Sequence, residues 1–275
     1  MTTVPTLPLN DGHAIPQVGY GVLMIPDDET AAVVTTAIEA GYRSIDTATI
    51  YGNEAGVGAG IASSGVPREE LFVTTKLWNT DQGDARAAFE ASLQRLGLDY
   101  VDLYMIHWPM PAQDQYVEAW RVLQQLRDEG LVRSIGVSNF EVHHLERLQR
   151  ETGVVPAVNQ IELHPRLVQD ELRAFHGAHG IATEAWSPLA RGALLDDAAL
   201  ASIAQAHDRS PAQIVLRWHV QLGNVVIPKS ATPERIAANL DLFDFALSDE
   251  EVAAISALDA PDGRTGPHPD TYGGS

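Results

Sequence analysis

Short apolar runs alternate with longer amphipathic stretches along most of the chain. The short runs are typical of buried strands, which we expect at Gly19–Val22, Ser44–Asp46, Leu71–Lys76, Val101–His107, Ser134–Ser138, Ala157–Gln160, Ile181–Trp186 and Val225–Pro228. Between them, apolar residues recur at spacings of three and four, which predicts helices at Glu29–Ala40, Glu54–Ser63, Asp84–Leu96, Tyr116–Asp128, Glu141–Gln149, Gln169–Ala178 and Pro211–Leu222. Ser210-Pro211 and Thr232-Pro233 each place a capping residue before a proline, which marks a helix start.

This alternation predicts an α/β fold with a parallel sheet and right-handed crossovers. Eight strands favour a closed (β/α)8 TIM barrel, which typically takes about 250 residues, and an open doubly wound sheet is the alternative. We expect residues 1–275 to form one barrel domain. Outside the repeat we expect an N-terminal hairpin at 4–18, extra helices at 196–207 and 248–258, and a C-terminal loop at 260–275 on the substrate side.

Composition excludes several classes of protein. The net charge of −19 and the lack of a basic cluster argue against a nucleic-acid partner. No apolar run of about 18 residues is present, so we expect no membrane span. Cysteine is absent and the N-terminus has no pattern of a secretion signal, so a cytoplasmic location is expected.

Polar residues follow the predicted strands at the ends that carry the active site in a barrel. They are Asp46, Lys76, His107, Ser138, Asn139, Gln160, Trp186, Ser187, Lys229 and Ser230. The chain has 16 arginines but only 2 lysines, and both lysines fall at this rim. A lysine ammonium at the end of an apolar strand needs a partner, and Asp46 on the neighbouring strand is the natural one.

Tyr51 lies in the loop that follows the strand ending at Asp46. A nearby lysine ammonium favours the phenolate, so we expect Lys76 to lower the pKa of Tyr51 and make it a usable general acid. An ordinary loop aromatic is the alternative interpretation.

Other chemistries lack their signatures. No G-x-S-x-G turn and no H-E-x-x-H motif are present, and His143, His144 and His164 lack metal-ligand spacing with carboxylates, so no metal site is expected. For His164 we expect a structural role. The glycines at 56, 58 and 60 superficially suggest a phosphate loop, but they lie in a helical pattern and predict close helix–sheet packing.

Several segments resemble the signatures of the aldo-keto reductase superfamily. Residues 41–54 resemble the first signature, residues 98–109 the second, and residues 227–230 the third, while 136–140 and 156–165 also match. The resemblance spans about residues 7–260 and looks closest to the bacterial 2,5-diketo-D-gluconate reductase branch, through Thr75–Asn79, Trp186 and His268–Asp270.

This resemblance implies a (β/α)8 barrel that reduces aldehydes and ketones with NADPH. It implies that Tyr51 donates the proton, Lys76 tunes Tyr51, Asp46 pairs with Lys76, and His107 orients the carbonyl. It also implies a set of cofactor-binding residues that includes Ser187. The others are Ser138, Asn139 and Gln160 at the carboxamide, Trp186 stacked on the nicotinamide, Leu189 to Gly192 over the pyrophosphate, Lys229, Ser230 and Arg235 at the 2′-phosphate, and Asn239 near the adenine. Ala238 departs from the family's glutamate, which puts the strength of NADPH preference in question.

The resemblance further implies a substrate pocket lined by Leu23, Trp78, His107 and Trp108 and closed by the tail. Such an aromatic wall suits small-molecule carbonyl substrates: small aldehydes, α-dicarbonyls and keto-sugars such as 2,5-diketo-D-gluconate. A monomer is expected. Two other functions remain open, an NADPH-sensing interaction protein of the same fold with little turnover, and a barrel lyase that forms a Schiff base on Lys76.

Overall fold

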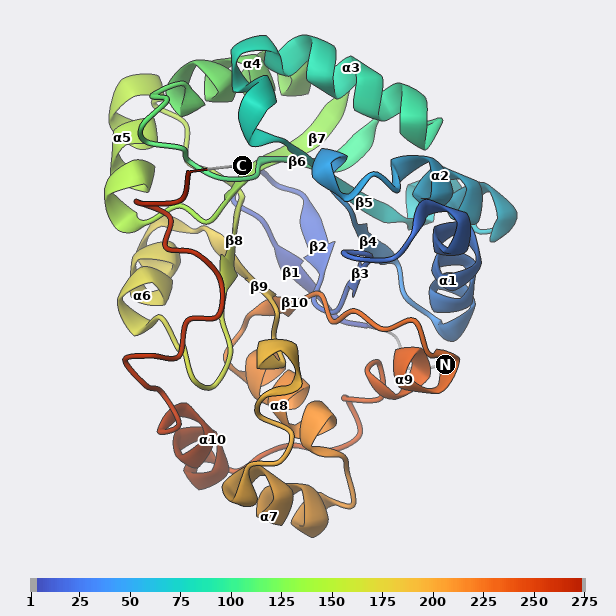
Figure 1. The fold of residues 1–275 in the computed structure, drawn as a ribbon, viewed down its shortest axis with the longest axis vertical. Helices are drawn as coiled ribbons and strands as arrows, with labels where there is room; N and C mark the ends of the chain where they lie inside the picture. The colour runs from blue at the N-terminus through green and yellow to red at the C-terminus, as the bar shows by residue number, and fades with distance from the viewer. Residues whose placement is uncertain (1–3, 274–275) are drawn as a thin grey trace.

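The computed structural model describes residues 4–273 and shows parallel strands curled into a barrel with helices outside it (Figure 1). The eight-stranded sheet runs in chain order through β3 Tyr20–Gly21, β4 Ser44–Asp46, β5 Phe72–Leu77, β6 Val101–Ile106, β7 Val132–Ser138, β8 Val158–Glu162, β9 Ala182–Trp186 and β10 Val225–Val226. The barrel closes because Val226 N–H donates to Gln17 O at 3.0 Å and Gly19 N–H donates to Val226 O at 2.8 Å. The closed barrel is therefore confirmed, and the open sheet is wrong.

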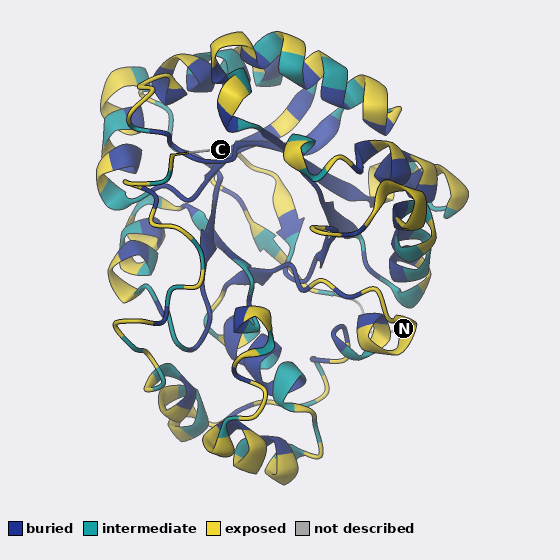
Figure 2. Ribbon diagram, viewed as in Figure 1, coloured by how far each residue is buried: buried dark blue, intermediate teal, exposed yellow. Residues whose placement is uncertain are grey.

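The helices present buried faces to the barrel and exposed faces outward (Figure 2). They are α1 Asp27–Ala40, α2 Glu54–Ser63, α3 Ala85–Leu96, α4 Tyr116–Asp128, α5 Val142–Thr152, α6 Asp170–His179, α7 Ala198–His207, α8 Pro211–Gln221, α9 Pro233–Ala238 and α10 Asp249–Ser256. The expected helix at 196–207 corresponds to α7, and the one at 248–258 to α10. Strand β10 is shorter than predicted, because Pro228 has no N–H to continue the ladder. No helix in the described part of the chain is long and apolar enough to cross a membrane.

The N-terminal hairpin closes one end of the barrel. Its strands, β1 Thr6–Pro8 and β2 Ala14–Pro16, pair antiparallel as predicted. Leu9 and Ile15 are buried against side chains from the barrel interior, including Leu103 and Val158. This apolar plug seals the end of the barrel where the strands begin, so any ligand must enter at the opposite end, where the strands finish.

The three glycines of α2 allow close approach of neighbouring helices. A Cβ on Gly58 would lie 2.0 Å from the carbonyl oxygen of Leu96 in α3, and one on Gly60 would lie 2.7 Å from Val34 Cβ in α1. The predicted packing role is thus correct but its partner is different, since helices rather than the sheet occupy the space. The residues lie within a helix, which is inconsistent with a phosphate loop.

The C-terminal tail is irregular from Ala257 to Gly273, as expected, while residues 274–275 lie outside the described residues. In Figure 1 it runs in red from α10 past α6 and α5 toward the open end of the barrel. Ala260 N–H donates to Arg166 O at 3.2 Å, and Val168 N–H donates to Asp259 Oδ1 at 2.9 Å. These bonds fix the tail beside the loop that follows β8.

Candidate active site at the open end of the barrel

A buried ion pair lies at the centre of the open end. Lys76 Nζ is 2.6 Å from Asp46 Oδ1 and also donates to Thr47 O at 2.9 Å. The exposed fractions of the two charged side chains are 0% and 2%. The pair forms because β4 and β5 are adjacent parallel strands, with Asp46 in register with Thr74, two residues before Lys76. The partner predicted for Lys76 is confirmed.

Tyr51 completes this charged group from the end of the short helix η1, Thr49–Tyr51. The Lys76 Nζ lies 5.2 Å from the centre of the Tyr51 ring. Burial raises the pKa of Tyr51, Lys76 lowers that pKa, and Asp46 raises it again, with a net pKa above the usual 10.0. Lys76 lowers the pKa of Tyr51, as predicted. The predicted net fall in that pKa does not occur, because the effect of burial is larger than the effect of Lys76.

Lys76 keeps its proton. Burial lowers the pKa of the Lys76 ammonium, but the neighbouring Asp46 and Tyr51 raise it, so that its net pKa lies above 10.5. A charged ammonium is not a nucleophile, and this side chain has no exposure to solvent. The site therefore does not support a Schiff base on Lys76.

His107 follows β6 and stands edge-on to two aromatic rings. Its ring centre lies 5.8 Å from that of Tyr51 and 5.2 Å from that of Trp78. Burial and the Lys76 charge hold the pKa of His107 well below its usual range, so the imidazole is neutral. The buried Nδ1 has no hydrogen-bond partner among the described residues. A neutral imidazole carries one N–H, which can donate to a carbonyl oxygen.

These residues open onto a cavity of about 460 Å³, a size typical of small-molecule sites. It is lined by the following predicted residues: Asp46, Tyr51 and His107 of the catalytic set, Asn139, Gln160, Trp186, Ser187 and Lys229 of the cofactor set, and Leu23, Trp78 and Trp108 of the substrate set. The other predicted residues do not line it; these are Lys76, Ser138, Leu189, Gly192, Ser230, Arg235 and Asn239. Lys76 lies beneath the cavity floor, where Asp46 and Tyr51 separate it from the cavity.

One hydrogen-bond network organises the cavity wall. Gln160 Nε2 donates to Asp46 Oδ2 and to Glu184 Oε2, at 2.9 Å each. Trp186 Nε1 donates to Asn139 Oδ1 at 2.8 Å, and Asn139 Nδ2 donates to His107 O at 3.0 Å. Because both N–H groups of Gln160 are taken by carboxyl groups, its Oε1 is left to accept a bond from a molecule in the cavity.

Ser138 joins this network from below. Its Oγ donates to Gln160 O at 2.8 Å and accepts from Asn139 Nδ2 at 3.0 Å. Ser138 therefore contacts the Asn139 side-chain amide and the Gln160 backbone carbonyl instead of facing the cavity. Asn139 itself has a positive φ of 63°, a left-handed conformation that asparagine tolerates better than most residues.

Sequence reasoning missed part of the cavity rim. The cavity also contacts Gly21, Met24, Ile50, Pro188, Ile227 and Pro267, which were not predicted, and Arg191, which lies inside the predicted range Leu189 to Gly192. Met24, Ser187 and Arg191 have positive φ values of 61°, 48° and 54°, and strained backbone of this kind clusters at functional sites. Met24 is 84% exposed and Ile50 49%, so they form an apolar lip. The signal available in the sequence was an apolar residue in a loop that follows a predicted strand.

A cationic rim lies at one side of the cavity. Arg191 and Lys229 both line it, and Arg235 lies in the short helix α9 that follows Lys229. Within residues 4–273, none of these three side chains forms an ion pair, although most other arginines do so in this acidic chain. Ser230 Oγ accepts from Thr232 N–H at 3.1 Å, and Asn239 is buried at the end of α9.

The tail is anchored to the cavity wall by a buried carboxylate, Glu162. It accepts bonds from Thr265 N–H at 2.6 Å, Gly266 N–H at 3.0 Å and His164 Nε2 at 3.2 Å. Burial alone would raise the pKa of Glu162, but these hydrogen bonds lower it to about 2. The structural role predicted for His164 is thus supported. Further along, the ring centre of Tyr272 lies 4.5 Å from that of Trp108, so the tail covers part of the cavity.

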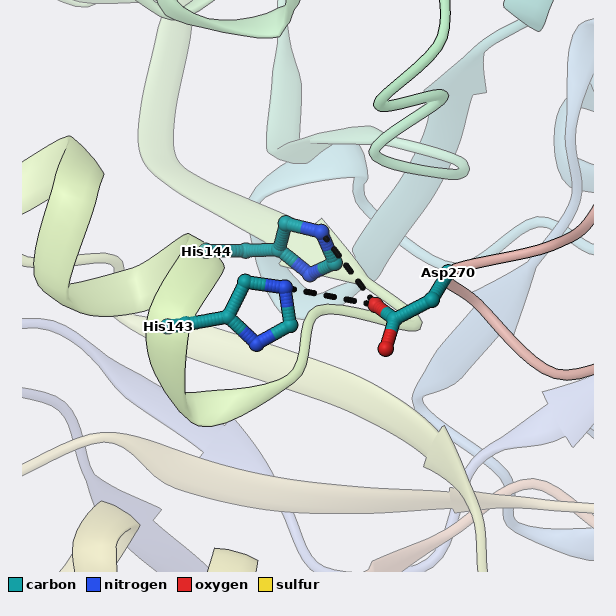
Figure 3. Close-up of side chains that lie close together, drawn as sticks. All are labelled: His143, His144 and Asp270. Carbon is teal, nitrogen blue, oxygen red and sulfur yellow. Dashed lines mark ion pairs between the residues drawn. The ribbon is translucent and has the colours of Figure 1, made fainter.

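A second contact holds the tail at α5 (Figure 3). Asp270 Oδ1 lies 3.3 Å from His143 Nε2 and 3.6 Å from His144 Nε2. The structure therefore brings a carboxylate to the two histidines, which sequence spacing did not indicate. His144 Nδ1 accepts a capping bond from Glu141 N–H at 3.1 Å, so the proton of the neutral ring sits on Nε2 and points to Asp270. A cation bound at Nε2 of His144 would require the ring proton on Nδ1, which could then no longer accept the capping bond. The contact of Asp270 with His143 and His144 therefore serves to hold the tail against α5.

Comparison with known proteins identifies the class that this barrel and site define. The model of the aldo/keto reductase family matches residues 17–260. The chain belongs to the aldo/keto reductase family, whose members are oxidoreductases that act on carbonyl groups.

Individual relatives match along nearly their whole length. An aldo-keto reductase from Mycolicibacterium smegmatis is 57% identical over 270 residues, covering 98% of each chain. Methylglyoxal reductase DkgA from Yersinia pestis is 54% identical over 275 residues, covering 99% of each chain. The crystal structure of a mutant of Gox0644 in complex with NADPH aligns with a TM-score of 0.95 at 50% identity, covering 98% of this chain and 99% of that one. The family expected from the sequence is confirmed.

Proposed function

We propose that this protein reduces the carbonyl groups of small aldehydes, α-dicarbonyls and keto-sugars with NADPH, and that Tyr51 is the general acid. The observation that carries the proposal is the buried Lys76–Asp46 pair beneath Tyr51 and His107 on one cavity. This arrangement provides a proton donor, a charge that stabilises the donor after it has lost its proton, and a neutral hydrogen-bond donor.

When bound, NADPH supplies the hydride that reduces the carbonyl carbon. Tyr51 gives its hydroxyl proton to the carbonyl oxygen, so hydride and proton together yield the alcohol. The Lys76 ammonium stabilises the tyrosinate that remains, and Asp46 keeps Lys76 in place and charged. His107 donates its N–H to the carbonyl oxygen and thereby orients the substrate toward Tyr51.

The residues in and around the cavity suit both ends of the cofactor, the nicotinamide and the adenine with its 2′-phosphate. Gln160 Oε1, held outward by the two carboxyl groups, would accept from the carboxamide, with Asn139 beside it. Ser138 would support the Asn139 amide and the backbone of Gln160. Trp186, held by Asn139, would stack on the nicotinamide. Ser187, Leu189 and Gly192 would lie along the pyrophosphate, Lys229, Ser230 and Arg235 around the 2′-phosphate, and Asn239 near the adenine.

The cationic rim supports NADPH in particular. Arg191, Lys229 and Arg235 carry positive charge without ion-pair partners among the described residues, in a chain with a net charge of −19. Phosphate groups are the ligands that such unpaired cations favour. The related Gox0644 structure was determined in complex with NADPH, which supports the same cofactor here.

The substrate class follows from the remaining wall. Leu23, Trp78 and Trp108 supply apolar and aromatic surface, with no charged side chain from the predicted substrate set. This wall favours short uncharged carbonyl compounds. Relatives are named methylglyoxal reductase, which supports an α-dicarbonyl as the first substrate to test.

The experiment follows NADPH absorbance with methylglyoxal, a panel of aldehydes and 2,5-diketo-D-gluconate, with NADH in parallel. We expect steady turnover with NADPH, and we expect Tyr51→Phe to remove turnover while NADPH still binds. Unchanged turnover in Tyr51→Phe would eliminate the assignment of Tyr51. Tight NADPH binding without turnover on any carbonyl would instead favour the alternative, an NADPH-sensing interaction protein.

A further inference from the structure

A second buried carboxyl group, Glu184, lies beside the reaction site. Glu184 is in the middle of β9, in register with Gln160 of β8, and only 1% of its surface is exposed. Strand alternation places its side chain on the same face as that of Trp186, two residues on, which lines the cavity. In the described part of the chain, Glu184 forms no salt bridge. A buried carboxyl group without a cationic partner is costly, so a specific use for it is expected.

Glu184 is joined to the ion pair through a single amide. Gln160 Nε2 has two N–H groups, of which one donates to Glu184 Oε2 and the other to Asp46 Oδ2, each at 2.9 Å. Asp46 accepts from Lys76 on its other oxygen at 2.6 Å. The buried chain therefore runs from Glu184 through Gln160 and Asp46 to Lys76, the lysine beneath Tyr51.

The charges around Glu184 determine its protonation. Burial raises the pKa of Glu184, and Asp46 raises it further, while the bond from Gln160 and the charge of Lys76 lower it, which leaves it at about 8. The ionisable groups that act on it are Asp46 from β4 and Lys76 from β5, and Glu184 in turn acts on Tyr51. Glu184 is thus largely protonated at neutral pH and ionises in mildly alkaline solution.

We propose that Glu184 is a positioning residue of the reductase, which holds the Gln160 amide toward the cofactor and, through its charge, extends to higher pH the range in which Tyr51 donates a proton. This inference rests on the proposed function. An ionised Glu184 adds negative charge near Tyr51 and disfavours the tyrosinate, so the pKa of Tyr51 rises. Reduction needs the protonated tyrosine, whereas alcohol oxidation needs the tyrosinate.

Two substitutions separate the charge from the hydrogen bond. Glu184→Gln keeps an oxygen that can accept from Gln160 but never ionises. Glu184→Leu removes both the charge and the acceptor. For each variant and the wild type, kcat/KM is measured against pH for carbonyl reduction and for oxidation of the matching alcohol, together with the Kd for NADPH.

In Glu184→Gln we expect the alkaline fall of reduction and the rise of oxidation to move to lower pH by at least about half a unit, with NADPH affinity within about twofold of the wild type. In Glu184→Leu we expect the same shift together with an NADPH Kd raised about fivefold or more, because Gln160 loses an acceptor. If the carboxyl group were merely structural, replacing it would lower activity at all pH values without shifting the fall of reduction or the rise of oxidation along the pH axis. If neither the fall of reduction nor the rise of oxidation shifted in pH in a folded Glu184→Gln protein, the inference would be overturned.

A measurement on the wild type keeps the test independent of folding and of turnover. Carbon-13 NMR of glutamate side chains should show one carboxyl that titrates near pH 8. Absence of any glutamate that titrates above about pH 6 would also overturn the inference. If the wild type failed to reduce any carbonyl, the proposed function would fail, and so would the kinetic role of Glu184, whereas the NMR titration would still show whether the buried carboxyl holds its proton.

Discussion

Gly266 of the tail lies against the indole of Trp186. A Cβ at position 266 would come within 2.6 Å of Trp186 Cη2 and within 3.2 Å of Glu162 Oε2. The same backbone donates its N–H to Glu162 at 3.0 Å, which fixes the tail at this distance. The tail therefore sets the position of the ring on which the nicotinamide is proposed to stack.

Gly266→Ala should weaken NADPH binding. The added methyl group must displace either the indole or the tail, and we expect the Kd for NADPH to rise by about tenfold, equivalent to about 1.4 kcal/mol. Quenching of tryptophan fluorescence by NADPH measures the affinity. The matched control is Gly273→Ala, since a Cβ there has no atom within 4 Å. Equal affinities in the two variants would show that Trp186 does not depend on the tail.

Lys229→Ala should weaken NADPH more than NADH. The two cofactors differ at the 2′-phosphate, and loss of a charge-assisted hydrogen bond costs about 1.5–3 kcal/mol. We expect the Kd for NADPH to rise by at least about tenfold and that for NADH to change little. Arg150→Ala, at an exposed arginine of α5, is the control. An equal loss for both cofactors would place Lys229 elsewhere on the cofactor.

Glu162→Gln should change the acid stability of the protein. The pKa of the folded Glu162 is about 2, below its ordinary value of 4.5, so its carboxylate stabilises the fold above pH 4.5. This contribution is lost as pH falls from about 4.5 toward 2, by up to about 1.4 kcal/mol per pH unit. Denaturant unfolding of both proteins across that interval measures it. We expect the wild type to lose more stability than the variant, and parallel curves would contradict the assignment.

Gly58→Ala should destabilise the barrel through its outer helices. A Cβ at this position overlaps the carbonyl oxygen of Leu96, so α2 and α3 must separate, at a cost of about 3 kcal/mol. Gly177→Ala in α6 is the matched control, because a Cβ there meets nothing within 4 Å and alanine favours a helix by about 0.5–1 kcal/mol. The free energies of unfolding should therefore change in opposite directions. Similar values would refute the packing role of Gly58.

Much of the site could be predicted because, in a barrel, strands that follow one another along the chain lie side by side. Asp46 ends β4, Lys76 lies one residue before the end of β5, and His107 follows β6. Adjacent parallel strands bring such residues to one rim. The Lys76–Asp46 pair followed from the cost of leaving an ammonium unpaired. Helix and strand limits followed from periodicity to within three residues. The largest difference is at the end of α5, which runs to Thr152, and β10 ends two residues early, before a proline.

The rest depended on contacts between distant segments. Asp270 reaches His143 and His144 across more than 100 residues, and no spacing rule indicates such a contact. The net pKa of Tyr51 is a balance of burial against two opposite charges, whose sign cannot be read from residue types. Glu184 did leave a signal, a lone acid in the apolar run 181–186, but only the register with Gln160 showed its partner.

The two lysines of the chain differ in a way that has a practical consequence. Lys76 is fully enclosed, whereas Lys229 is exposed at the mouth of the cavity. A reagent that acylates primary amines would therefore find one reachable lysine side chain in the folded protein, placed where the cofactor is proposed to bind. Because acylation would remove the charge proposed to hold the 2′-phosphate, bound NADPH should protect this lysine from the reagent, and the extent of labelling at Lys229 would report occupancy of the cavity.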